Sequence, residues 1–485
     1  MRNLNFDLNL AIMNYGRDPD AIERYNICRG TRKFYTNFNV SVELNRKTDS
    51  TQLSNALRAM ILKTPNLSSN AFRDDNSDDK KCKGFNFKIN YLKKIEFETA
   101  VSFEKFDKLD GEFFTLLDQR YCPIGDQLPL WRLVVFENSE TQILSFYCDH
   151  TFFDGTSGVL FMKDLVKELN ECWKSPNLSY QPVLFDFEKD APSLGRIPRG
   201  AFSGLSLYKL SIFEAVRIAF YELCVPSFVK KFLQSYIWGG PNLFQNPLFV
   251  SGCRGKAVPK TCVRPVSLTN DLAGPLLKLC KANKVTFTPL LTTLTLYSFQ
   301  QTVKKKLSLE NTSSRINIDI NGRRYLPEYV NRYGLCISTS ISLVAPIPSP
   351  GKWFDKNSPL KKTNKTLLDD LASRYPFRFG GILNYVNPWS LVEKQLGLTD
   401  WKTLDCSNVG VQDISCGDWY ATSAWFSQST GMTLNLVLSC ISVKGAINIC
   451  FGFASALVDL VGEETIDAFE AHFKRTIHDL IETSA

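Results

Sequence analysis

Histidine is scarce in this sequence, which has three among its 485 residues, so few side chains can titrate near neutral pH. Long apolar runs are also missing, since polar residues interrupt every stretch that could reach the roughly 18 residues of a membrane-spanning helix. Basic residues form no stripe with interleaved aromatic side chains, which argues against binding of nucleic acid. We therefore expect neither a membrane-spanning nor a nucleic-acid-binding protein.

The 14 cysteines are spread from Cys28 to Cys450, without a CxxC pair and without a histidine at the spacing of zinc ligands. A disulfide framework is typical of short secreted chains, which this sequence does not resemble. We therefore expect reduced and mostly buried thiols, as in a cytosolic protein, and no metal site. The first ten residues mix apolar side chains with Asn and Asp, so they do not form the apolar centre of a secretory signal.

Composition indicates a folded chain. Hydrophobic residues make up 44% and charged residues 22%, which argues against extended disorder. The length is too great for one small core and favours two or three domains or one large pseudo-symmetric unit. The net charge of +8 is spread along the chain, so charge alone does not select an anionic membrane surface or a phosphorylated cofactor as the partner.

The first half of the chain contains segments typical of α/β structure. Apolar residues alternate over residues 34–44, as in a strand, and recur at helical spacing over residues 51–63. Two further strands are expected at 131–136 and 142–149, joined by a polar turn into a hairpin. A helix is expected at 156–170.

Three other segments of this half have less regular patterns. Residues 68–83 are polar, acidic and then basic, which predicts a solvated insert. Residues 182–198 are rich in Asp and Pro and are expected to form a crossover linker. Residues 201–239 combine aromatic and aliphatic residues with charges of both signs. They predict a helical connector packed on the body or, as the alternative, an amphipathic helix pair lying on a bilayer.

A second α/β half is expected from about residue 256, with the same order of strand and helix but no clear sequence repetition. Residues 463–482 predict a strongly amphipathic helix, and His472 and His478 lie on the flanks of its apolar stripe. Both histidines are therefore expected to be solvated. The other elements predicted here are strands at 265–268, 315–320, 433–441 and 446–453 and helices at 270–283 and 286–300.

The remaining histidine, His150, lies in the sequence His-Thr-Phe-Phe-Asp-Gly between the strand at 142–149 and the helix at 156–170, whose expected N-cap is Thr156 or Ser157. An imidazole held in such a loop can take a proton from a hydroxyl or an amine as that group attacks a thioester. The alternative is an ordinary polar residue that closes a strand. The packed elements on both sides favour the chemical role.

Short motifs occur in a characteristic order at residues 32–38, 131–133, 150–158, 163–165, 286–289, 321–327, 407–410 and 426–431. With them the chain resembles the fungal alcohol acetyltransferase family, within the superfamily of chloramphenicol-acetyltransferase-like, HxxxD-type CoA-dependent acyltransferases. The resemblance runs from about residue 25 to the C-terminus. It implies an α/β fold of two lobes, each a mixed β-sheet with helices, and an active-site channel between them.

The resemblance also implies roles for individual residues. His150 would be the catalytic base of a direct transfer without a covalent acetyl-enzyme. Asp154 would point away from the imidazole and pair with an arginine that holds the loop in shape. Arg323 is our choice for that partner, with Arg324 as the next candidate. The alternative for both arginines is solvation after a strand.

Two glycines and four polar residues complete the expected site. Gly155 and Gly158 would let the loop turn and the helix approach closely, which a general turn role explains equally well. The oxyanion of the tetrahedral intermediate needs hydrogen-bond donors, and Ser and Asn are also common in ordinary turns. The candidates for these donors, or for the wall of the acceptor channel, are Ser407, Asn408, Ser427 and Ser429.

By this resemblance, residues 1–190 form an N-terminal acyltransferase lobe with the HxxxDG motif, residues 191–255 a connector and residues 256–485 a C-terminal acyltransferase lobe. Acetyl-CoA is the expected cosubstrate, with no permanently bound cofactor. The expected second substrate is a small hydrophobic or amphipathic acceptor, and the expected protein is a cytoplasmic monomer. Peripheral contact with the endoplasmic reticulum, another membrane or a lipid droplet is left open.

The function expected first is acetylation of an alcohol or sterol hydroxyl. An alternative within the same chemistry is an N-acetyltransferase for an amphipathic, sphingoid-like amine, like the relative that detoxifies sphingolipid-synthesis inhibitors. A carboxylate in the acceptor channel would favour the amine, because a protonated amine must lose a proton before it attacks. An alternative of another class is a non-catalytic lipid-binding protein with the same fold.

Overall fold

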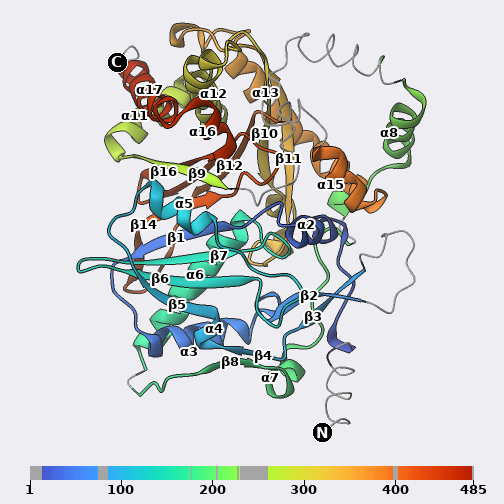
Figure 1. The fold of residues 1–485 in the computed structure, drawn as a ribbon, viewed down its shortest axis with the longest axis vertical. Coiled ribbons are helices and arrows are strands. Elements are labelled where there is room, and N and C mark those ends of the chain that lie inside the picture. Colours follow the sequence, from blue (N-terminus) through green and yellow to red (C-terminus); the bar gives the residue numbers. More distant parts are fainter. Residues whose placement is uncertain are drawn as a thin grey trace.

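The computed structural model describes residues 12, 14–74, 86–175, 177–203, 206–226, 229, 260–396 and 402–482. Two six-stranded sheets organise these residues, and Figure 1 shows them as two lobes, one above the other. The first lobe is built on the sheet that contains β1 (Phe38–Leu44), and the second lobe on the sheet that contains β10 (Ser314–Asn321).

The sheet of the first lobe has the strand order β13-β14-β1-β7-β6-β5. Helix α6 (Gly155–Trp173) packs on one face of this sheet, and α3 (Ser50–Ile61) packs against α6. Helix α5 (Gly111–Asp118) lies against β1 and β14, where the rings of Phe114 and Trp425 are 5.5 Å apart. The other strands are β5 (Val101–Lys105), β6 (Trp131–Glu137), β7 (Gln142–Cys148), β13 (Ser415–Cys416) and β14 (Trp419–Gln428).

Smaller elements surround this sheet, and they correct two predictions. The solvated insert expected at 68–83 begins with a strand whose first residues are buried, while residues 75–85 lie outside the described residues. The linker expected at 182–198 contains a strand and a helix, because Leu184 and Phe185 bury their side chains. These elements are α2 (Ala21–Thr31), β2 (Ser69–Arg73), β3 (Phe87–Tyr91), β4 (Lys94–Glu96), α4 (Phe97–Ala100), β8 (Val183–Asp186) and α7 (Phe187–Leu194).

The sheet of the second lobe has the order β11-β10-β12-β15-β16-β9 and is mixed, since β12 runs parallel to both of its neighbours. Figure 1 shows helices gathered around this upper lobe, and α17 (Glu463–Glu482) begins and ends as predicted. The remaining elements are β9 (Thr261–Leu268), α11 (Asn270–Ala282), α12 (Phe287–Phe299), β11 (Ile337–Val344), α13 (Pro359–Ser373), α14 (Tyr375–Gly380), α15 (Pro388–Leu396), β12 (Leu404–Val411), β15 (Leu436–Val443), β16 (Ala446–Ala454) and α16 (Ser455–Val461).

Strand β14 links the two lobes. It comes from the C-terminal half of the chain but lies in the first sheet, antiparallel to β1, with Phe38 opposite Gln428. The domain boundaries expected at residues 190 and 255 stay a prediction. In space, the segment predicted as the C-terminal lobe supplies two strands, β13 and β14, to the first sheet.

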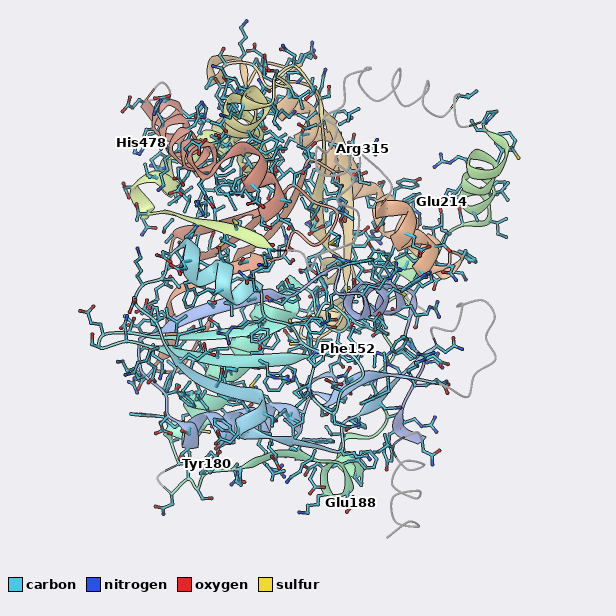
Figure 2. The ribbon with its side chains drawn as sticks, viewed as in Figure 1. Phe152, Tyr180, Glu188, Glu214, Arg315 and His478 are labelled. Carbon is cyan, nitrogen blue, oxygen red and sulfur yellow. The ribbon has the colours of Figure 1, made fainter. Side chains whose placement is uncertain are left out.

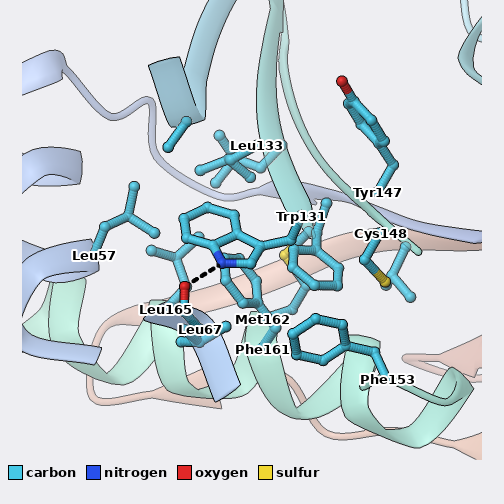
Figure 3. Packing of buried hydrophobic residues seen from close by; sticks show 14 of the residues in the cluster. Leu57, Leu67, Trp131, Leu133, Tyr147, Cys148, Phe153, Phe161, Met162 and Leu165 are labelled. Carbon is cyan, nitrogen blue, oxygen red and sulfur yellow. Dashed lines mark hydrogen bonds between the residues drawn. The ribbon is translucent and has the colours of Figure 1, made fainter. Parts of the chain in front are cut away.

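The aromatic core of the first lobe supports the end of β7. Trp131 is fully buried, and its indole N–H donates to the carbonyl of Leu67 at 2.8 Å, as Figure 3 shows. The rings of Phe146 and Phe161 stack at 4.0 Å between β7 and α6. A buried indole with its donor satisfied and a close-packed ring pair leave little freedom to the strand end that precedes His150.

Helix α8 (Ile212–Cys224) falls within the segment predicted as a packed connector. The structure does not match that prediction for one side of the helix, because Ile212, Phe213, Val216 and Phe220 are 62–89% exposed among the described residues. The helix is attached through polar contacts, including Glu214 with Arg378 at 3.0 Å. Most of the rest of the predicted helix pair, residues 227, 228 and 230–239, lies outside the described residues.

Several other expectations can be compared with the described residues. Their cysteines are free thiols, as predicted. None of their helices combines the length and apolar character needed to cross a bilayer. His478 is exposed, but His472 is only partly exposed and was wrongly expected to be solvated. Its Nδ1 lies 3.1 Å from the Ser298 hydroxyl because α17 packs on α12 along that flank.

Candidate active site

A cavity lies where the two sheets approach each other. Its interior volume is about 70 Å³, and it opens to solvent. Figure 2 shows Phe152, two residues after His150, near the middle of the molecule. Both lobes contribute to the wall, the first through Phe38, His150, Gly155, Phe426 and Gln428 and the second through Asp319, Asn321, Ile337, Ser407 and Asn408.

The imidazole of His150 is held by aromatic neighbours. Its ring centroid lies 5.1 Å from that of Phe38 and 5.7 Å from that of Tyr35. The carbonyl of His150 accepts a hydrogen bond of 3.0 Å from the side chain of Asn26. Nδ1 is buried, and the ring belongs to a residue of the cavity wall.

The surroundings of His150 keep its ring neutral. Burial lowers the pKa of the imidazole, and the positive charge of Arg29 lowers it further. The carboxylate of Asp154 acts in the opposite direction, but it does not outweigh burial. The net pKa is below the usual value, which leaves an unprotonated nitrogen available at neutral pH.

Asp154 closes the loop after His150 and begins helix α6. It is the N-cap, because its Oδ1 accepts from the backbone N–H of Ser157 at 2.8 Å, so the predicted caps Thr156 and Ser157 were wrong. Its Oδ2 accepts from Arg323 at 2.6 Å and from the backbone N–H of Cys336 at 3.0 Å. With both oxygens occupied, the carboxylate makes no hydrogen bond to the imidazole.

Arg323 lies in the short helical turn Gly322–Tyr325 that follows β10, and it joins the lobes through Asp154. Both side chains are at most 3% exposed. The guanidinium also donates to the carbonyls of Arg332 at 3.0 Å and Gly334 at 2.9 Å. Burial alone would raise the pKa of the Asp154 carboxyl, but Arg323 and the backbone donors outweigh it and lower the pKa. Arg324, the second candidate, is exposed.

The two predicted glycines occupy tight places. A Cβ at Gly158 would lie 2.8 Å from a methyl group of Val40, so only glycine lets α6 approach β1 this closely. A Cβ at Gly155 would lie 3.1 Å from both Phe426 and Val409. Both glycines therefore help to set the distance between the helix and the sheet beside His150.

The four polar candidates divide into two pairs. Ser407 and Asn408 line the cavity together with His150. Ser427 and Ser429 are 1% exposed and are not part of the wall. Side chains alternate along a strand, and in β14 it is Phe426 and Gln428 that face the cavity. The same alternation could have separated the serines from the site at the sequence level.

A charged residue of the wall, Asp319, was missed. Asp319 is a charged residue inside the alternating run of β10, where Ile316, Ile318 and Ile320 are buried. A carboxylate in the middle of a central strand is a signal of a site, because charge is rarely buried without a reason. Gln428 lies between the predicted Ser427 and Ser429, inside the motif expected at 426–431. Among the described residues no three His, Cys, Asp or Glu side chains gather as in a metal site.

This chain is similar in sequence to one known family and to a protein of yeast. The sequence model of the alcohol acetyltransferase family matches residues 20–477. The N-acetyltransferase SLI1 of Saccharomyces cerevisiae is 28% identical over 169 residues. That match covers 33% of this chain and 34% of the relative, so it spans about a third of the relative's length.

Solved structures show the same fold. The trichothecene 15-O-acetyltransferase TRI3 of Fusarium sporotrichioides has a TM-score of 0.63 and 13% identity, with 94% of this chain and 95% of that chain covered. The first condensation domain of the calcium-dependent antibiotic synthetase has a TM-score of 0.60 and 14% identity, with 96% of each chain covered. The predicted fold class of two chloramphenicol-acetyltransferase-like lobes is confirmed.

Proposed function

The chain belongs to the alcohol acetyltransferase family and is an acyltransferase, and from this premise we propose that it moves the acetyl group of acetyl-CoA to an alcohol or sterol hydroxyl. His150 is the general base in this proposal. The resemblance inferred from the motifs is confirmed at the level of the family.

The proposed reaction is a direct transfer. Neutral His150 accepts the hydroxyl proton on Nε2 as the acceptor oxygen attacks the carbonyl carbon of the thioester. The new C–O bond forms, the C–S bond breaks, and the imidazolium returns the proton to the departing CoA thiolate. The lowered pKa of His150 supports this role, because a ring that is neutral in the resting enzyme can take up a proton.

Other residues would position the reacting groups. Asp154 and Arg323 would hold the His150 loop through their buried ion pair, without contact to the substrate. Ser407 and Asn408, which line the cavity, are the proposed donors or channel residues near the oxyanion. Ser427 and Ser429 have no proposed contact with the substrate, because they are buried outside the wall.

The observation that carries the proposal is the position of His150, an imidazole of lowered pKa in the wall of a cavity shared by both lobes. Purified full-length chain with acetyl-CoA and a panel of alcohols is expected to release CoA thiol. His150→Ala is expected to reduce the rate by about 100-fold or more, the usual size of a general-base contribution.

The matched control is His478→Ala, since that histidine is exposed on α17 and distant in sequence from the motif. It should leave the rate unchanged. Full activity of folded His150→Ala would refute the proposed mechanism. Absence of thiol release by the parent with every acceptor, alcohol or amine, would favour the non-catalytic lipid-binding function.

One observation favours a second acceptor class, an amphipathic amine. Asp319 places a carboxylate in the wall of the same cavity as His150, which is the feature expected for an amine acceptor. The yeast relative SLI1 is an N-acetyltransferase. The monomeric state stays a prediction, to be measured on the purified protein. The cytoplasmic location and peripheral contact with the endoplasmic reticulum or lipid droplets also stay predictions, to be measured on the tagged protein.

A further inference from the structure

A carboxyl and a hydroxyl of the second lobe meet in the wall of the cavity. Strands β10 and β12 run parallel, with Ile318 opposite Cys406. Asp319 and Ser407 come one residue later on each strand, so their side chains share the other face of the sheet. The Ser407 hydroxyl bonds to the Asp319 carboxyl, and both residues line the cavity with His150. The carboxyl therefore lies beside a proposed donor to the oxyanion.

The charges around Asp319 favour a neutral carboxyl. Its side chain is partly exposed through the cavity but otherwise enclosed by protein. Lys402 lies 3.8 Å from Asp405 on the neighbouring strand, and one ammonium cannot neutralise two carboxylates. Burial and, after it, the like charge of Asp405 raise the pKa of the Asp319 carboxyl to about 8, although Lys402 acts in the opposite direction. At neutral pH the carboxyl therefore keeps its proton.

The titratable and charged groups near Asp319 come from both lobes. Those on β12 and just before it are Asp405, Lys402 and Cys406. At the other side of the cavity, Asp154 is paired with Arg323 and His150 has a neutral ring. The groups at that side add no net positive charge beside Asp319, so they leave its proton in place.

The proton on Asp319 determines where the hydrogen of Ser407 points. A hydroxyl has one hydrogen to donate but can also accept. If the carboxyl is ionised, Ser407 donates its hydrogen to the carboxylate, and none is left for a substrate. If the carboxyl is neutral, its O–H can donate to the Ser407 oxygen, and the hydroxyl hydrogen can turn into the cavity. Oδ1 of Asp319 accepts from the Thr339 hydroxyl at 3.2 Å, which favours the proton on the other oxygen.

An unpaired amide indicates independently that a ligand presents an oxygen to this cavity. Gln428, from β14 of the first sheet, is 9% exposed and lines the cavity, and its Nε2 has no hydrogen-bond partner among the described residues. A buried N–H group without a partner costs free energy, so it is usually satisfied by water or by a ligand. Ser407 can add a second donor from the other lobe only if its hydrogen is free.

We propose that Asp319 is a positioning residue whose neutral carboxyl donates to Ser407 and so directs the hydroxyl hydrogen of Ser407 toward the oxyanion of the tetrahedral intermediate. Asp319 does not touch the substrate in this role, and its proton stays in place through the reaction. The inference rests on the proposed acetyl transfer and concerns the same site. It holds for an alcohol and for an amine, because the oxyanion comes from the acetyl group.

The test is the pH dependence of thiol release by full-length protein with acetyl-CoA and 1-octanol, an acceptor that does not titrate in the range used. The kcat of the parent is expected to fall by about 10-fold or more between about pH 7 and about pH 9.5, as Asp319 ionises. Asp319→Asn should stay within about threefold of the parent at pH 7, because its amide N–H can donate to Ser407 in place of the O–H. The fall at alkaline pH should be absent from this variant.

A second variant, Ser407→Ala, covers the case in which Asp319→Asn does not fold. It should lower kcat by about 100-fold or more, the usual cost of a lost oxyanion donor, and flatten the fall at alkaline pH, since no hydroxyl remains to be directed. Asp370→Asn is the matched control, because this half-buried carboxyl also bonds to a serine, Ser340, but lies outside the cavity wall. It should keep both the rate and the fall of the parent.

An alkaline fall that persists unchanged in Asp319→Asn or in Ser407→Ala would overturn the inference while acetyl transfer by His150 stands. The same measurements with octylamine test the opposite charge state. A loss of rate in Asp319→Asn that is confined to octylamine would also overturn the inference, because it would show that Asp319 is ionised and binds an ammonium group. Absence of thiol release by the parent with both acceptors would instead contradict the proposed transfer itself.

Discussion

The ion pair between Asp154 and Arg323 is the contact on which the loop of His150 depends. Both partners are buried, and each remaining polar atom of the pair meets a backbone group or Ser157. Attraction within such a pair repays the cost of removing two charges from water only when these further hydrogen bonds are made. The pair therefore stabilises one particular position of the loop between the lobes.

Removal of Arg323 should be severe. Arg323→Ala leaves Asp154 as a buried charge without a counter-ion, and we expect the free energy of unfolding to fall by about 3–5 kcal/mol and acetyl transfer to be lost with it. Arg323→Lys should give an intermediate loss, since an ammonium cannot reach the carbonyls of Arg332 and Gly334 together with Asp154.

Thermal unfolding and thiol release measure both effects. Arg324→Ala is the control, because that side chain is exposed and lies against the ring of Tyr325. An Arg323→Ala protein as stable as the Arg324→Ala protein would show that the buried pair does not hold the structure.

At the scale of residues, the HxxxDG motif and the short motifs after it predicted most of the candidate site. His150, Asp154 and Arg323 could be predicted because their order in the sequence is characteristic, and the structure brings all three together. Asp319 could not, because it lies on a strand of the second sheet and meets His150 only when the two sheets approach each other. The residues next to each other in the sequence do not show how close the two sheets lie in space.

At the scale of elements, the closest approach is that of helix α6 to strand β1. Gly158→Ala would place a Cβ 2.8 Å from Val40 and 3.1 Å from Phe38, and neither neighbour can move freely in a closely packed sheet. We expect a loss of about 1–3 kcal/mol of unfolding free energy, the usual cost of overpacking, and a lower rate because α6 carries the Asp154 cap.

The matched change is Gly351→Ala in the turn Pro350–Lys352, where an added Cβ would meet no atom within 4 Å beyond its chain neighbours. This variant should be neutral or more stable by up to about 1 kcal/mol, since alanine leaves the unfolded chain less conformational freedom than glycine does. Urea unfolding of both variants gives the comparison. Equal stability of the two would mean that the packing of α6 on β1 is looser than the contacts indicate.

Element predictions succeeded where periodicity was long. The amphipathic pattern of α17 and the hairpin of β15 and β16 gave elements at the right places, because one buried face dictates the sequence. Strands β2 and β8 were missed, since each has at most five residues and polar neighbours. The N-cap of α6 is Asp154 and not the predicted Thr156 or Ser157, and the same side chain also forms the ion pair with Arg323.

At the scale of the whole molecule, stability should depend on a third carboxylate, Asp118 at the end of α5. It is fully buried. Burial raises the pKa of this carboxyl to about 8, although the nearby hydroxyl of Thr261 acts in the opposite direction. Between about pH 4 and pH 8 the folded chain therefore keeps a proton that the unfolded chain releases.

The free energy of unfolding therefore falls as the pH rises between these two values. The contribution of Asp118 to stability is fully present below the unfolded pKa and is lost as the pH rises through the folded value, with a slope of up to about 1.4 kcal/mol per pH unit. Asp118→Asn removes this slope, so the variant should melt at a higher temperature than the parent at pH 8, with a smaller difference at pH 5.

Thermal unfolding at several pH values between 5 and 8.5 measures the difference between variant and parent, which removes the contribution of all other groups. Asp107→Asn, an exposed position in the same region, is the control. Parallel curves for Asp118→Asn and the parent would show that this carboxyl is already paired or ionised in the folded protein.

The position of β14 in the first sheet has a consequence for synthesis on the ribosome. Residues 419–428 leave the exit tunnel only after most of the chain has been made, so the growing polypeptide carries β1 with one edge unpaired until then. Such an edge can pair with other nascent chains. Translation speed and chaperone supply should therefore govern the yield of this protein more than they do for one whose sheets are complete in chain order.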